Sequence, residues 1–225
     1  MNLTEKYKTV LLKSPLFAGM TDSGIDGALE LLNGKVRVYE KGDLIHKPWT
    51  MLTEFGLVLS GVVQACSDDI DGNRMIMTEV QPGTTFGESL CYLKTKDSPV
   101  YIHASEDASV LWLSLDILCS DTTDKQVHEM QKRFMRLLAS RTLAMNNRIQ
   151  ILSRLTIRDK LIVYFSELSA AAGKNTFNVP LNREDMATYI GADRAALSRE
   201  LSKMRKEGII DFYKNSFTIK KRFEK

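Results

Sequence analysis

The chain has 225 residues, of which 44% are hydrophobic and 26% charged, which is typical of a globular protein with one or two domains. Its three cysteines form no Cys-x-x-Cys pair, so neither a disulfide framework nor a structural zinc site is indicated, and its net charge is only +3. No apolar run approaches the about 20 residues that span a bilayer, and residues 1–13 lack a signal-peptide core, so we expect a cytoplasmic protein without a membrane partner.

The N-terminal part is predicted to be a small β-domain, covered at one end by helices at residues 11–17 and 22–32. Short runs rich in Val, Leu, Ile and Met alternate there with glycine-bearing turns, and each run has the length of a strand. These runs are 35–39, 43–46, 54–59, 62–67, 75–80, 101–104 and 109–114. Asp71, Gly72 and Asn73 form one strong turn signal, and Pro82 with Gly83 forms another. We therefore predict an α+β chain in which residues 1–120 form an antiparallel β-roll.

Residues 121–153 contain neither Gly nor Pro and predict one long helix. A mostly apolar stripe at roughly heptad spacing runs along it, through Val127, Met130, Phe134, Leu137 or Leu138, the polar Arg141, Met145 and Ile149. Such a stripe on a helix longer than about 25 residues usually buries against a second copy, so it favours a homodimer. The alternative is a helix that folds back on its own domain.

Residues 154–225 are predicted to form a winged helix-turn-helix domain. A first helix over 183–190 ends at Gly191, which accepts a left-handed backbone, and Asp193 can cap the next helix. The apolar faces of the two helices consist of Met186, Ala187, Ile190, Leu197, Leu201 and Met204. Residues 208–213 and 217–219 then predict two short strands joined by a turn, which is a wing.

The other face of the second helix carries the candidate DNA contacts Arg194, Ala195, Ser198, Arg199 and Lys203. A guanidinium can donate two parallel hydrogen bonds to O6 and N7 of guanine, so Arg194 and Arg199 are predicted to read bases. Ser198 can contact a base or a phosphate, and Ala195 can pack on a thymine methyl. Arg183 and Lys203 are expected at backbone phosphates. The alternative is a helical hairpin with a solvated basic face.

Charge divides the chain near residue 120. Residues 1–120 contain 10 Lys and Arg against 16 Asp and Glu, a net charge of −6, and residues 121–225 contain 21 against 12, a net charge of +9. A basic half suits a polyanion, and an acidic half does not. The distribution agrees with DNA binding by the C-terminal half alone.

A β-roll, a long helix and a winged helix-turn-helix follow one another in the chain, and this order resembles the Crp/Fnr family of bacterial transcription regulators. The resemblance includes the motif near the end of the roll that contains Pro82, Gly83, Phe86, Gly87 and Glu88. The resemblance covers nearly the whole chain. It implies a regulator, not an enzyme, in which a signal at the roll repositions two DNA-binding domains. The partners it implies are a palindromic DNA operator, a second copy of the chain, RNA polymerase and an unidentified small-molecule effector.

In the family pattern, Gly87, Glu88, Ser89 and Leu90 open the segment that cradles a cyclic nucleotide. The cyclic-nucleotide branch carries an arginine for the cyclic phosphate, followed by a small residue, where this chain has Ser98 and Pro99. Losing such a charge-assisted contact costs about 1.5–3 kcal/mol, so we predict no tight binding of cyclic AMP. Glu88 is then expected to have a structural role at its turn.

Other family sensors leave several alternatives open. Residues 1–65 contain no cysteine for the family's iron-sulfur cluster, so no such cofactor is expected. His46, His103 and His128 have no metal-ligand spacing, which argues against a metal site without excluding haem. Redox sensing through Cys66, Cys91 or Cys119 would need a lowered thiol pKa. The favoured hypothesis is a small organic ligand between the roll and the long helix, near Glu88, Met145 or Asn146; the alternative is a roll without a ligand.

Three rival functions differ from a signal-controlled regulator. A cupin-like enzyme would need a cluster of metal ligands on neighbouring strands, and only His46 and His103 lie in the roll. An interaction module with a degenerate DNA domain should have lost the outward basic residues, which Arg194 and Arg199 contradict. The third is a DNA-binding regulator with a vestigial roll that needs no ligand.

Overall fold

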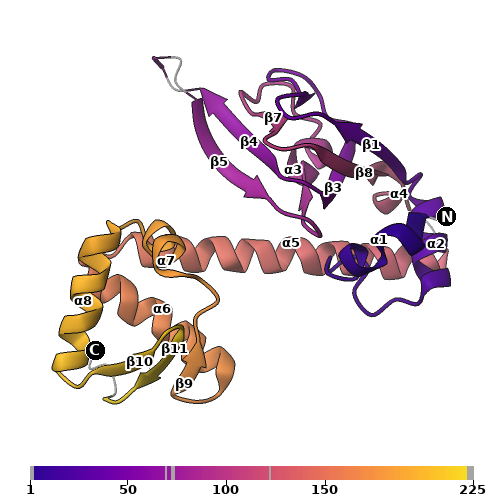
Figure 1. The fold of residues 1–225 in the computed structure, drawn as a ribbon. Coiled ribbons are helices and arrows are strands. Elements are labelled where there is room, and N and C mark those ends of the chain that lie inside the picture. The colour runs from indigo at the N-terminus through magenta and orange to yellow at the C-terminus, as the bar shows by residue number, and fades with distance from the viewer. Residues whose placement is uncertain (1–2, 69, 72–73, 122, 222–225) are drawn as a thin grey trace. The chain divides into compact units, whose positions relative to one another are not determined.

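The computed structural model describes residues 3–68, 70–71, 74–121 and 123–221. The chain divides into two compact units, Met1–Leu138 and Ala139–Lys225, and Figure 1 labels most of their elements. The helix α5 (Lys125–Leu152) contributes residues to both units. The α+β fold class is confirmed: an antiparallel β-domain is followed by a long helix and a helix-turn-helix.

The first unit is built on two four-stranded antiparallel sheets, with strand orders β1-β8-β3-β6 and β2-β7-β4-β5. The strands are β1 (Lys35–Tyr39), β2 (Leu44–His46), β3 (Glu54–Ser60), β4 (Val63–Asp68), β5 (Arg74–Val80), β6 (Thr85–Phe86), β7 (Tyr101–Ala104) and β8 (Ala108–Ser114). Val58 and Trp112 of one sheet join Val63 and Ile102 of the other in a single buried cluster. All seven predicted strands are present, and β6 was missed because it has only two residues. Gly72 and Asn73 of the predicted turn lie outside the described residues.

Besides α5, the described residues of the first unit form the helices α1 (Leu3–Leu11), α2 (Asp22–Leu31), α3 (Glu88–Tyr92) and α4 (Leu115–Leu118). The predicted helix at 11–17 is wrong, because the first helix ends at Leu11 and Pro15 has no N–H to continue it. A second buried cluster joins α1 and α2 to the sheet and to the first half of α5. The rings of Phe55 and Phe134 lie 5.5 Å apart in it.

The long helix was predicted correctly, but its apolar residues form two separate surfaces, one buried and one exposed. The first, Val127, Met130, Phe134 and Leu137, is buried within the first unit. Met145 and Ile149 are instead 65% and 60% exposed. The heptad spacing of the buried set would continue to positions 141, 144 and 148. Met145 and Ile149 each lie one residue further along the chain, on the neighbouring row of the helix. The expectation that the whole stripe faces a second copy is therefore wrong for its N-terminal half.

The second unit contains three further helices and a small sheet of order β10-β11-β9 (Figure 1). Its elements are α6 (Ile157–Ala172), β9 (Thr176–Asn178), α7 (Arg183–Ile190), α8 (Arg194–Lys206), β10 (Ile210–Tyr213) and β11 (Ser216–Ile219). The predicted helix-turn-helix and wing are confirmed, and β9 adds a third strand. Ile151 at the end of α5 is buried in the same core as Phe165 and Phe217. Of the described helices, none has both the length and the apolar character to cross a membrane.

Candidate nucleic-acid interface

Helix α8 is fixed at its start by its own sequence. Gly191 ends α7 with φ of 63°, and the Asp193 carboxylate accepts a hydrogen bond from the Ala196 N–H at 2.8 Å. Both features were predicted from the residue types. Leu197, Leu201 and Met204 are buried in the core of the unit. The opposite face of α8 is therefore held outward.

The predicted DNA contacts on α8 all lie on this outward face: Arg194, Ala195, Ser198, Arg199 and Lys203 are exposed. Ser198, Arg199 and Lys203 line an open surface depression of about 440 Å³ together with Ser202 and Lys206. The sequence interpretation missed these last two residues. Helical spacing could have found them, because Ser202 and Lys206 lie four and three residues after Ser198 and Lys203, respectively.

Arg194 has one charged partner close to the turn. Its Nη1 lies 3.4 Å from Oε2 of Glu184, and the two side chains are 65% and 72% exposed. An exposed ion pair of this kind contributes little to stability, so a DNA phosphate or base can replace the carboxylate. Both residues border a second depression of about 500 Å³, which Lys214 and Asn215 of the wing also line.

Arg183 is half-buried, unlike the other candidates. Its guanidinium lies over the rings of Phe217 and Phe212, at 4.9 and 5.2 Å from their centroids, and Nη2 donates to the Lys214 carbonyl at 2.9 Å. Burial lowers the pKa of Arg183, and its buried Nη1 has no hydrogen-bond partner among the described residues. The guanidinium thus joins α7 to the wing, and its predicted phosphate contact stays a prediction.

In the roll, the segment from Gly87 to Leu90 begins helix α3. Gly87 has φ of 80°, and a Cβ added there would lie 2.4 Å from Cδ2 of Leu52. Glu88 is 4% exposed and accepts a hydrogen bond from the Thr85 hydroxyl, whereas Ser89 is exposed. Leu90 packs partly against the core of the roll. The side chain of Leu52 therefore lies close beside the backbone of Gly87, the first residue of the segment that the resemblance assigns to a cyclic nucleotide.

Ser98 takes part in local hydrogen bonds. Its hydroxyl accepts from the Val100 N–H at 3.2 Å, and its carbonyl accepts from the Trp49 N–H at 2.8 Å. Pro99 is exposed. The other two residues of the predicted effector site, Met145 and Asn146, are exposed on α5 and belong to the second unit.

The pKa of each cysteine side chain is raised, not lowered as redox sensing would need. Burial raises the pKa of Cys66 and Cys119, and it raises the pKa of Cys91 to about 11. Thiolate, the reactive form, is therefore scarce near neutral pH. Among the residues that the structure describes, no three His, Cys, Asp or Glu side chains are grouped closely enough to hold a metal ion.

Two family models match separate parts of the chain. Residues 36–118 match the cyclic nucleotide-binding domain, and residues 159–223 match the Crp-like helix-turn-helix domain. The first match covers the roll and the second covers α6 through the wing.

Curated relatives of the chain are transcription regulators. The anaerobic regulatory protein of Aggregatibacter actinomycetemcomitans is 23% identical over 185 residues, which are 80% of this chain and 70% of that protein. The transcriptional activator protein FnrA of Stutzerimonas stutzeri is 23% identical over 202 residues, 88% of this chain and 80% of that protein.

Solved structures share the fold. A variant of CprK complexed with OCPA aligns with a TM-score of 0.60 at 17% identity, over 87% of this chain and 88% of that one. The catabolite activator protein of Thermus thermophilus aligns with a TM-score of 0.51 at 22% identity, over 92% of this chain and 93% of that one.

Proposed function

The chain belongs to the Crp/Fnr family of transcription regulators, and we propose that it binds a palindromic operator as a homodimer whose affinity is set by a signal at the roll. In this proposal residues 1–120 sense the signal, residues 121–153 form the dimer interface and residues 154–225 bind DNA. RNA polymerase is the proposed protein partner at the promoter. We propose no catalytic activity.

One observation carries the DNA-binding proposal. Helix α8 buries Leu197, Leu201 and Met204 while it exposes Arg194 and Arg199 on its other face. A capped helix anchored in this way can enter a major groove, and the first turns of such a helix lie closest to the bases. We propose Arg194 and Arg199 as base readers, Ala195 and Ser198 as neighbouring contacts, and Lys203 as a phosphate contact.

The exposed apolar residues of α5 support the dimer. Met145, Ile149 and Leu152 are 65%, 60% and 41% exposed, and they continue from Thr142 at alternating three- and four-residue spacing. That spacing is the seam of a coiled coil, in which a second helix covers the apolar side chains. A two-fold dimer also presents two copies of α8 to half-sites about one DNA turn apart.

The input is proposed to be something other than a cyclic nucleotide. Ser98 supplies no cation for a phosphate, and Leu52 lies against Gly87. A small organic effector is our first candidate, and the structural neighbour complexed with OCPA supports ligand binding in a protein of this fold. The packing of Leu52 favours the second candidate, a regulator that needs no ligand.

Selection from a random duplex library tests the proposal. The full chain should enrich a two-fold symmetric sequence, and light scattering should give a dimer both free and on that duplex. The variant carrying Arg194→Ala and Arg199→Ala should lose this preference while it stays dimeric. A pool without a motif, or a monomer bound to one half-site, would contradict the proposed function.

A further inference from the structure

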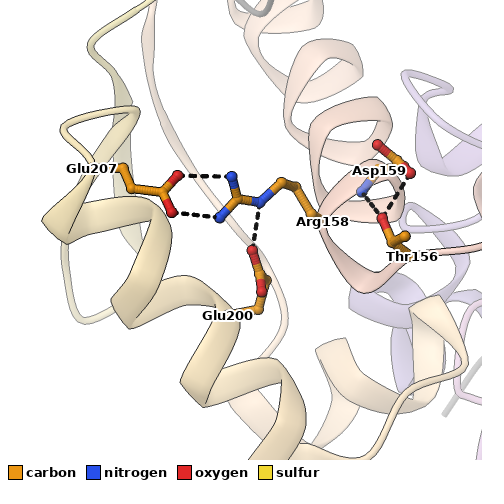
Figure 2. Close-up of polar contacts among 5 residues, drawn as sticks. All are labelled: Thr156, Arg158, Asp159, Glu200 and Glu207. Atoms are coloured by element: carbon orange, nitrogen blue, oxygen red, sulfur yellow. Dashed lines mark hydrogen bonds and ion pairs between the residues drawn. The ribbon is translucent and has the colours of Figure 1, made fainter.

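Arg158, in the first turn of α6, has three charge-assisted hydrogen bonds to α8 (Figure 2). Its Nη1 and Nη2 donate to the two carboxylate oxygens of Glu207 at 2.7 and 3.0 Å, and its Nε donates to Oε1 of Glu200 at 2.6 Å. The two carboxylates raise the pKa of Arg158, and the guanidinium lowers the pKa of Glu207. The Arg158 side chain thus binds both Glu200 in the middle of α8 and Glu207 at its C-cap.

The backbone beneath Arg158 is itself fixed. The Thr156 hydroxyl caps α6 by accepting from the Asp159 N–H at 3.0 Å, and it donates to the Asp159 carboxylate at 2.6 Å (Figure 2). Such a reciprocal cap holds the first turn of a helix. Arg158 therefore projects from a capped turn, and its N-cap Thr156 lies four residues after α5 ends at Leu152.

This network has more hydrogen bonds than the other ion pairs described on α8, and its side chains are less exposed. The side chains of Arg158, Glu200 and Glu207 are 29%, 21% and 35% exposed, so solvent screens them only in part. Arg205 and Asp211, by comparison, are 54% and 47% exposed and share one contact of 2.9 Å. A planar guanidinium fork restricts direction as well as distance, which an ammonium group does not.

We infer that Arg158 is a positioning residue for DNA reading: it sets the direction of α8 relative to α6 and thereby the sequence preference of the regulator. The inference rests on the proposed function. Base contacts depend on the placement of α8 to within fractions of an ångström, while contacts to phosphates tolerate small shifts. Loss of the fork should therefore reduce discrimination more than it reduces general affinity.

The test substitutes lysine, which keeps the charge and removes the fork. For Arg158→Lys in the full chain, the ratio of dissociation constants for scrambled and selected duplex should fall about tenfold, while affinity for scrambled DNA changes less than about twofold. Arg205→Lys is the matched control, because it makes the same chemical change at an ion pair of α8, with Asp211, that does not involve α6. It should leave the ratio unchanged. If Arg158→Lys fails to fold, Glu207→Gln removes one acceptor and should lower the ratio in the same direction.

A distance measured without DNA keeps the two proposals separable. Spin labels at the exposed positions Ala171 of α6 and Ser202 of α8 report the distance between these two helices. Exposed Cys119 is replaced by serine, and labelled chain is diluted in unlabelled chain. Arg158→Lys should broaden or shift this distance, and Arg205→Lys should not. An unchanged distance, or equal losses on both duplexes, would overturn the inference. A wild-type chain without sequence preference would refute the proposed function instead, and the distance alone would then decide the role of Arg158.

Discussion

Arg199 is the residue whose loss should change specificity. Its exposed guanidinium lies on the outward face of α8, where bidentate contact with a guanine is feasible. We expect Arg199→Ala to weaken binding to the selected operator by about 1–3 kcal/mol and to relax the choice at one base pair in each half-site. Competition binding with operators substituted at each position measures this. Equal losses on operator and random DNA would show that Arg199 contacts phosphate only.

Lys203→Ala is the contrasting change on the same helix face. A phosphate contact carries no sequence information, so all duplexes should lose affinity alike and the salt dependence should become flatter. Binding curves at several salt concentrations, on operator and on random DNA, give both quantities. A specificity change as large as that of Arg199→Ala would place Lys203 at a base.

Arg183 should matter more for the wing than for DNA. Its guanidinium covers Phe212 and Phe217 and donates to the carbonyl of Lys214, so Arg183→Ala removes ring contacts and one hydrogen bond together. We expect a loss of about 1–3 kcal/mol in the free energy of unfolding, measured with urea. Arg183→Lys, which keeps the charge without the planar fork, should recover only part of it. Unchanged stability with uniformly weaker DNA binding would contradict this role and support the predicted phosphate contact of Arg183.

The cysteines should react slowly near neutral pH. Burial raises the pKa of all three thiols, so their thiolate fraction is below that of a free cysteine and increases as pH rises toward the pKa. Timed alkylation by iodoacetamide, followed by mass spectrometry, should modify exposed Cys119 first and spare buried Cys66 and Cys91. Rapid modification of any thiol at pH 7 would reopen redox sensing.

At the scale of elements, α5 should lose its partner when its exposed seam is charged. Ile149→Glu would place two carboxylates inside a dimer interface, which we expect to weaken association by about 2–4 kcal/mol, or roughly 30- to 1000-fold. Leu143→Glu is the matched control, because Leu143 is 65% exposed on the same helix and lies outside the seam positions. Sedimentation over a range of concentrations measures both. Equal effects of the two variants would contradict the seam.

Elements defined by local signals could be predicted from the sequence, and faces defined by distant contacts could not. Gly191 correctly predicted the end of α7, and Asp193 correctly predicted the start of α8, because helix caps depend only on residues close by in the chain. Which part of the predicted α5 stripe is buried within its own unit depends on residues such as Phe55, far away in the chain. Periodicity alone could not separate the buried Phe134 from the exposed Ile149. Arg158 lies 42 and 49 residues from Glu200 and Glu207, so no spacing rule could have indicated it.

At the scale of the whole molecule, the division of charge follows the division of the chain. Met1–Leu138 contains 14 Lys and Arg against 19 Asp and Glu, a net charge of −5, and Ala139–Lys225 contains 17 against 9, a net charge of +8. In the proposed function, the basic second unit binds DNA and the acidic first unit receives the signal. A signal can act there only if it binds the DNA-competent and incompetent states with different affinity.

Cyclic AMP should fail this requirement. Ser98 uses its hydroxyl for the Val100 N–H and its carbonyl for the Trp49 N–H, and neither can replace the arginine that would neutralise a cyclic phosphate. We therefore expect no heat of binding in isothermal titration of the full chain with cyclic AMP and no change in operator affinity when the nucleotide is added. Ser98→Arg tests the cause, because it restores the cation without altering Gly87 or Glu88. Micromolar affinity in the unsubstituted chain would contradict the prediction. If only the Ser98→Arg variant binds cyclic AMP, the missing cation explains why the unsubstituted chain does not bind it. If this variant does not bind either, the packing of Leu52 against Gly87 is the next explanation to test.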